Sequence, residues 1–365
     1  MELADIFRQY GPAYRAKYGD KMPPNHLAVM RAIEACRTEA LGGHLYCCAE
    51  CDEPWYSYHS CRNRHCPKCQ QEAAQDWLER QCQLLLPVPY FLVTFTLPAE
   101  LRTVARSHQQ VIYNLLFRTA ADALQTLAQD RLGGQIGIVG VLQTWTRDLR
   151  FHPHVHFLVP GGALNPAGTQ WLASRKNFLV RVEPLGQLFR GKFKTALKKS
   201  TLFAKVSSTV WGKAWVVDSR PVGTGEAALK YLAPYVFRVA ISNNRILKVE
   251  HDKVTFRYRE GDSGRWRTAT LPAEEFIRRF LQHVLPIGFV KVRYFGLFAP
   301  GNRHRLHQAQ ALLGASTAPA VAPVADTQQP PQPKAMTCPH CGAPLTCVRV
   351  IPAMARSPPR MTSPL

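Results

Sequence analysis

The cysteine pattern constrains the first 87 residues more than any other feature of this chain. Eight of the eleven cysteines lie there. Two pairs follow a Cys-x-x-Cys pattern, Cys48/Cys51 and Cys66/Cys69, with fourteen residues between them. Each pair fits one tight turn, and two such turns can supply four thiolates to one tetrahedral Zn²⁺. We therefore expect a small zinc-stabilised module, in preference to a set of buried free thiols.

Further metal donors lie nearby and at the far end of the chain. In the first module they could replace a ligand or hold a second ion, and they are Cys61, His65, Cys47 and His44. The sequence CPHCG near the C-terminus resembles half of a zinc ribbon that lacks its second pair. It leaves open whether the tail cysteines, Cys338, Cys341 and Cys347, form a working or a defective site.

Composition divides the chain into four segments. Residues 1–87 are predicted to form a helical, zinc-binding and DNA-binding domain, and residues 88–310 alternate strand-like and helix-like stretches. An Ala/Pro-rich linker at 311–335 and a tail at 336–365 with a partial zinc-ribbon-like Cys-x-x-Cys follow.

The second segment has the pattern of an α+β fold. Residues 90–97, YFLVTFTL, predict a buried strand, and residues 100–130 have helical apolar spacing that ends at Gly133-Gly134. Two more strands are expected at 136–145 and 154–159. Their connection is short, so they should pair antiparallel, with helices packed over one antiparallel sheet.

The sequence FHPHVHFLVPGG is the sharpest chemical motif. Side chains alternate along a strand, so His154 and His156 should project to the same side, where two imidazoles can hold one divalent ion. His152 joins that face if the strand continues through Pro153. The alternative is a pair of surface histidines on an edge strand.

A pair of tyrosines stands in the predicted helix at 225–233. Tyr231 and Tyr235 are four residues apart, which places both on one helix face, although Pro234 would kink the segment. By itself such a pair is most often part of an amphipathic core face.

Charge predicts a polyanionic partner. The chain has 46 Lys and Arg against 25 Asp and Glu, a formal net charge of +21, which favours nucleic acid. The first residues lack the pattern of a secretory signal and no stretch predicts a membrane helix, so we expect a cytoplasmic protein with no membrane partner. The basic and polar residues expected to contact DNA are Arg62, Arg64, Arg238, Asn243 and Arg245.

Aromatic residues interleaved with the basic segments could stack on unpaired bases, although each is more often part of a core. These residues are Phe189, Phe193, Trp211, Tyr294 and Phe295.

These motifs occur together in an order that resembles one family. From about residue 10 to 310 the chain is similar to the two-tyrosine HUH transposases of the insertion sequence 91 type. The residues that carry the resemblance are GGHLYCCAEC, YHSCRNRHCPKCQ, FHPHVHFLVPGG, YLAPYVFRVAISNNRI and HVLPIGFVKVRYFGLF.

The resemblance implies an HUH endonuclease fold preceded by a small zinc-binding module. It implies that His154 and His156 hold a catalytic Mg²⁺ or Mn²⁺ and that Tyr231 and Tyr235 are nucleophiles. Structural Zn²⁺ would be bound by Cys48, Cys51, Cys66 and Cys69. The third catalytic ligand stays open between His152 and Gln143.

The implied activity is nicking and rejoining of single-stranded DNA at element ends through 5′-phosphotyrosine intermediates, by a rolling-circle-like route. Single-stranded element ends and target DNA would be the partners, and the bacterial protein would be nucleoid-associated when bound to DNA. A rolling-circle replication initiator, a zinc-dependent DNA-binding regulator without catalysis, and a zinc hydrolase are the alternatives. The hydrolase is the weakest, since no Asp or Glu lies within HPHVH.

Overall fold

The computed structural model describes residues 1–69, 77–78, 81–82, 84–237, 239–261, 263–314 and 336–354. They form two compact units. The first unit combines residues 1–69 with the C-terminal segment, and the second contains the residues between 70 and 320.

The first unit begins with two helices, α1 (Leu3–Tyr18) and α2 (Pro24–Ala35). They pack against each other through apolar side chains such as Phe7 and Met30, both fully buried. An ion pair of 2.6 Å between Arg15 Nη1 and Glu34 Oε1 also links them.

A three-stranded antiparallel sheet completes this unit. Strand β1 (Gly43–Cys48) lies between β2 (Pro54–Tyr58) and β13 (Leu345–Ile351). The central strand therefore pairs with one strand that follows it directly and with one that comes from the other end of the chain.

The second unit is built on a five-stranded sheet in the order β12-β4-β5-β3-β8, in which all neighbours are antiparallel. This arrangement confirms the α+β class and the antiparallel pairing of the two strands joined by a short connection. The strands are β3 (Pro89–Thr96), β4 (Gly137–Trp145), β5 (Phe151–Pro160), β8 (Val217–Thr224) and β12 (Val292–Gly296).

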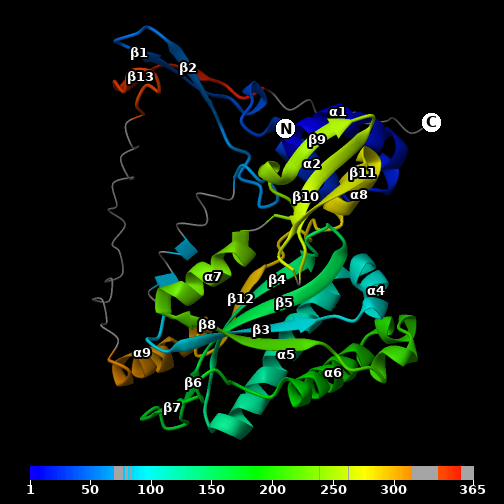
Figure 1. Cartoon of the computed structure of the whole chain (residues 1–365), viewed down its shortest axis with the longest axis vertical. Helices are drawn as coiled ribbons and strands as arrows, with labels where there is room; N and C mark the ends of the chain where they lie inside the picture. The colour runs from blue at the N-terminus through cyan, green and yellow to red at the C-terminus, as the bar shows by residue number, and fades with distance from the viewer. Residues whose placement is uncertain are drawn as a thin grey trace, which may run out of the picture. The chain divides into compact units, whose positions relative to one another are not determined.

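Helices cover both faces of this sheet (Figure 1). Val155 and Phe157 of β5 share one core with α5 (Gln109–Leu132) and α6 (Val182–Lys198). Leu158, on the opposite side of the same strand, belongs to a second core with α7 (Gly225–Phe237). The central strand is therefore covered on both sides.

The helix predicted over residues 100–130 is divided in two. His108 has φ −132° and ψ 49°, outside the helical region, and separates α4 (Arg102–Ser107) from α5. The end of α5 is as expected, because Gly133 adopts φ 75° and its N–H donates to the carbonyl of Gln129.

Smaller elements complete the second unit. A second three-stranded sheet has the order β11-β10-β9, and β6 pairs with β7. The remaining elements are β6 (Gly162–Leu164), β7 (Trp171–Ala173), β9 (Ile246–Glu250), β10 (Lys253–Arg259), β11 (Trp266–Pro272), α8 (Ala273–Leu281) and α9 (Arg303–Leu312).

None of the helices within the described ranges combines the length and apolar character needed to cross a bilayer. The predicted linker at 311–335 overlaps the end of α9, and its residues 315–335 lie outside the described part of the chain.

Candidate active site and metal centres

The histidine pair lies on the central strand of the five-stranded sheet. His154 and His156 are 9% and 6% exposed, and their ring centroids are 4.8 Å apart. They project to the same face, as the strand pattern predicts, and β5 runs through Pro153, so His152 continues the row with its ring 5.3 Å from that of His154. Because β5 is central, the alternative of surface histidines on an edge strand is wrong.

A hydrogen bond sets the tautomer of His154, and a second hydrogen bond holds the ring of His156. Nδ1 of His154 lies 2.7 Å from the carbonyl oxygen of His152, which can only accept, so Nδ1 carries the proton and Nε2 keeps its lone pair. Burial lowers the pKa of His154 to about 4, so the ring is neutral near pH 7. Nδ1 of His156 lies 2.9 Å from Oγ1 of Thr94. A neutral imidazole oriented through its other nitrogen is the form that binds metals.

Two side chains compete for the place of a third donor. Gln143 is opposite His154 in the β4–β5 register and is 5% exposed. Its side-chain amide oxygen is the atom that could bind a cation, because the amide nitrogen is only a donor. His152, in contrast, accepts a hydrogen bond of 2.8 Å at Nδ1 from Arg102, and burial and that cation lower its pKa. Gln143 thus faces His154 directly across the strand pair, whereas Nδ1 of His152 is already engaged by Arg102.

Helix α7 covers the face of the sheet that carries the histidines. It packs against β3, β4 and β5, and its buried side chains share a core with sheet residues on that face. Those helix residues are Ala228, Leu229, Leu232 and Val236. The helix is continuous through Pro234, so the backbone at 231 and 235 lies on one helix.

Tyr231 is 37% exposed, and the guanidinium carbon of Arg220 lies 5.7 Å from its ring centroid. Its partial exposure distinguishes it from the core residues of α7. The side chain of Tyr235 and the whole of Arg238 lie outside the described residues.

The other residues expected to contact DNA differ in their surroundings. Arg62 and Arg64 are exposed beside the cysteines of the first unit, and Asn243 is half-buried. Arg245 instead donates to backbone carbonyls, at 2.9 Å to Arg257 and also to those of Ala240 and Arg147. Its guanidinium thus holds three backbone segments together.

The aromatic residues between the basic segments mostly serve the core. Phe189 and Phe193 are fully buried, and both rings contact Trp215. Trp211 stacks on Phe203 with ring centroids 5.7 Å apart. These rings are packed against one another, as expected of core residues.

The cysteines form two clusters instead of one. The N-terminal cluster contains Cys36, Cys61, Cys66 and Cys69, and the split cluster contains Cys48, Cys51, Cys338 and Cys341. The expectation that the Cys48/Cys51 and Cys66/Cys69 pairs share one ion is therefore wrong. Each pair finds its partners elsewhere: the first in the C-terminal segment, the second in Cys36 and Cys61.

The sulfur distances fit metal binding. Within each cluster all four sulfurs lie within 4.8 Å of one another. A tetrahedral zinc–thiolate site, with Zn–S of about 2.3 Å, has sulfurs about 3.8 Å apart. In the N-terminal cluster the distances from Cys69 Sγ are 3.5 Å to Cys36 and 3.7 Å to Cys61.

Cys36 is the ligand candidate that the sequence did not reveal. It follows α2 as a lone cysteine, with no partner at metal-ligand spacing. Cys47 and Cys347 lie outside both clusters. The thiol of Cys47 lies 3.4 Å from a carboxylate oxygen of Asp52, and Cys347 is exposed.

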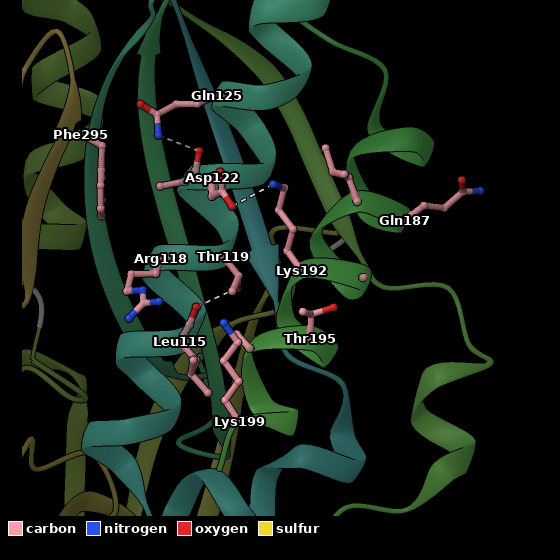
Figure 2. A pocket seen from close by; sticks show the side chains of 14 residues that line it. Leu115, Arg118, Thr119, Asp122, Gln125, Gln187, Lys192, Thr195, Lys199 and Phe295 are labelled. Atoms are coloured by element: carbon pink, nitrogen blue, oxygen red, sulfur yellow. Dashed lines mark hydrogen bonds and ion pairs between the residues drawn. The ribbon is translucent and has the colours of Figure 1, made fainter. Parts of the chain in front are cut away.

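A basic groove lies between α5 and α6, on the face of the sheet opposite the histidines. Figure 2 shows Arg118 and Lys199 lining it, with Lys192 Nζ bonded to Asp122 at 2.8 Å. It can attract anions, but it is not part of the histidine site.

Comparison with known proteins assigns both units to transposases. Residues 137–305 match a family described as "Putative transposase", and residues 6–97 match a family described as "Transposase zinc-binding domain". No solved structure matches the chain.

Two curated relatives extend this assignment. The chain is 43% identical over 342 residues to "Putative transposase y4qJ" of Sinorhizobium fredii, covering 86% of this chain and 85% of that protein. It is 28% identical over 282 residues to "Transposase for insertion sequence element IS801" of Pseudomonas savastanoi pv. phaseolicola, covering 73% and 68%. The chain therefore belongs to the insertion sequence 91 family of transposases, and its first unit contains a zinc-binding domain.

Proposed function

We propose that this transposase nicks and rejoins single-stranded DNA at the ends of its element, using Tyr231 and Tyr235 as nucleophiles. The observation that carries the proposal is the position of α7, which packs over the sheet face on which His154 and His156 are buried. The formal charge of +21 supports binding of a polyanionic strand.

The proposed step is a phosphoryl transfer without an external energy source. The phenolic oxygen of one tyrosine attacks the scissile phosphorus, and the bond from phosphorus to the 3′ oxygen breaks. The phenol loses its proton, and the leaving 3′ oxygen takes one up to become a hydroxyl. The new phosphotyrosine keeps the free energy of the phosphodiester, so a 3′-hydroxyl can later reverse the reaction.

The residues of the sheet fit a divalent cation. His154 and His156 would hold it, and Gln143 is the best placed third donor. When bound, Mg²⁺ or Mn²⁺ would withdraw charge from the scissile phosphate. The phenol ionises near pH ~10 in water, so the attack needs such electrostatic help.

Two nucleophiles suit two consecutive transfers. One tyrosine would hold the first 5′ end while the other cuts the next junction. The tyrosines are four residues apart on α7, about one helical turn. Bound to DNA, the protein would be found in the cytoplasm with the nucleoid.

The test is a covalent adduct assay with the full-length protein, Mn²⁺ and a single strand containing an element end. A 3′-labelled strand should become protein-linked on a denaturing gel, and a 5′-labelled strand should not, because the enzyme would retain the 5′ phosphate. Tyr231→Phe and Tyr235→Phe should each retain some adduct, the double variant none, and Tyr258→Phe should behave as wild type.

An adduct formed by the double variant would refute the assignment of the nucleophiles. Absence of any adduct from the wild type, with DNA binding intact when divalent ions are chelated, would favour a non-catalytic DNA-binding regulator. Cleavage at a plasmid origin instead of element ends would favour a replication initiator.

A further inference from the structure

We propose that the split cluster binds one Zn²⁺, and that this metal fastens the C-terminal segment to the N-terminal unit. The ligands are Cys48 and Cys51 from one end of the chain and Cys338 and Cys341 from the other. The tail would thus be the missing half of a zinc ribbon. The family match to a zinc-binding domain covers residues 6–97 and does not include the tail.

The sulfur geometry is that of a tetrahedral site. Cys341 Sγ lies 3.4 Å from Cys48 Sγ and 3.9 Å from Cys51 Sγ, and Cys338 Sγ lies 3.6 Å from Cys51 Sγ. These distances bracket the edge of about 3.8 Å expected around Zn²⁺ and are far longer than a disulfide bond of about 2.05 Å. The four cysteines are free.

The two Cys-x-x-Cys turns are built alike. The N–H of Asp52 donates to the carbonyl of Cys48 at 3.0 Å, and the N–H of Gly342 donates to that of Cys338 at 2.9 Å. Asp52 and Gly342 both adopt positive φ, 51° and 77°. In each turn the N–H of the first cysteine also donates across the turn, from Cys48 to Glu53 and from Cys338 to Ala343. Two matched turns facing one another are the arrangement of a zinc ribbon.

Apolar packing does not account for the tail's position. Strand β13 pairs with β1 over six residue pairs, from Gly43–Ile351 to Cys48–Leu345. Yet the side chains of the two outer strands are largely exposed, including Trp55 at 42% in β2 and Val348 at 56% and Val350 at 65% in β13. A small sheet without a hydrophobic face is marginal in water, so a metal crosslink is the missing source of stability.

The four thiolate donors indicate which ion binds. A tetrahedron of thiolates favours Zn²⁺, or iron in a comparable site.

The crosslink joins distant parts of the chain. The paired cysteines are 287 and 293 residues apart in sequence. The second unit is therefore an insertion between the two halves of a metal site, and the ion closes a loop that includes it.

Metal counting on the purified full-length protein tests the proposal. Native mass spectrometry with elemental analysis should find two Zn²⁺ per chain in the wild type and one in the double variant C338S/C341S. C48S/C51S should also retain one. The variant that combines all four substitutions should still retain one, because both pairs bind the same ion. C347S, in the same tail, should keep two, and C341H, which retains a ligand, should also keep two.

A second measurement reads the attachment of the tail directly. A specific protease site is placed in the Ala/Pro-rich sequence near residue 325 and cleaved. After cleavage, the C-terminal fragment should still co-elute with the rest of the chain on size-exclusion chromatography. A chelator, or the C338S/C341S substitutions, should separate the two.

Two Zn²⁺ in C338S/C341S, none in the fourfold variant, or iron in place of zinc would overturn the proposal. Retention of the fragment after complete removal of the metal would overturn the fastening role.

Discussion

At the scale of single residues, burial decides the protonation state of two histidines, His154 and His283. His154 and His283 are both enclosed, and burial lowers the pKa of each to about 4. For His154 this leaves a neutral ring ready for a metal. For His283, which bonds Thr144 and Leu149 and stacks on Phe151, it leaves a neutral core residue that acid will destabilise.

His283 makes the second unit sensitive to acid. Its folded pKa lies below the ordinary 6.5, so between pH 6.5 and 4 the unfolded chain binds a proton that the folded chain does not. The free energy of unfolding therefore falls as the pH falls. When the pH is lowered from 7 to 5, the free energy of unfolding should fall by about 2 kcal/mol less in His283→Gln than in the wild type. Urea titrations at both pH values measure this difference, and equal losses would contradict it.

The third ligand to the proposed catalytic ion can be identified by metal titration. Gln143 shares the face of His154, whereas the ring of His152 is engaged by Arg102. Gln143→Ala should raise the Mn²⁺ concentration for half-maximal adduct formation at least about tenfold, and His152→Ala only a few-fold. The reverse ranking would assign the ligand to His152.

At the scale of elements, the sheet that carries the histidines depends on how closely α5 packs against its opposite face. Gly140 of β4 faces Phe157 and Phe117, and a Cβ there would lie 2.7 Å from the Phe157 ring. This position lets α5 pack directly on the strands. Gly191 of α6, in contrast, has nothing within 4 Å of a Cβ.

These two glycines form a matched pair of variants. Gly140→Ala should destabilise the second unit by about 1–3 kcal/mol through overpacking. Gly191→Ala should stabilise it by up to about 1 kcal/mol, since alanine is the better helix former. Denaturant midpoints at constant m-value measure both changes. Equal effects of the two substitutions would show that Gly140 is not a packing requirement.

Local patterns predicted the elements that carry the candidate active site. Alternation along residues 154–159 predicted the shared face of the histidines, because the period of a strand is two. The end of the long helix followed from Gly133, which adopts the left-handed conformation. The break at His108 had no local signal, since the apolar spacing continues on both sides of it.

At the scale of the whole molecule, the grouping of the cysteines and the net charge both depend on the entire chain. The grouping of the cysteines could not be predicted, because Cys36 has no partner at metal-ligand spacing and Cys48 finds Cys341 only through the fold. Net charge, in contrast, is a property of the whole sequence. The value of +21 predicts directly that the protein binds a polyanion.

Binding of a single strand should depend steeply on salt. If the protein neutralises roughly six phosphates, the logarithm of the association constant should fall with the logarithm of salt concentration with a slope of about −4. Fluorescence anisotropy with a labelled oligonucleotide, in the absence of divalent ions, measures the slope. An affinity independent of salt would contradict a role for the excess of positive charge.

The adduct itself locates the reacting atom. Trypsin cleaves after Lys230 and Arg238, so one peptide, residues 231–238, contains both proposed nucleophiles. After reaction with an element-end strand and nuclease digestion, mass spectrometry should find this peptide carrying a nucleotide 5′ phosphate on Tyr231 or Tyr235. A nucleotide attached to any other peptide would contradict the proposed chemistry.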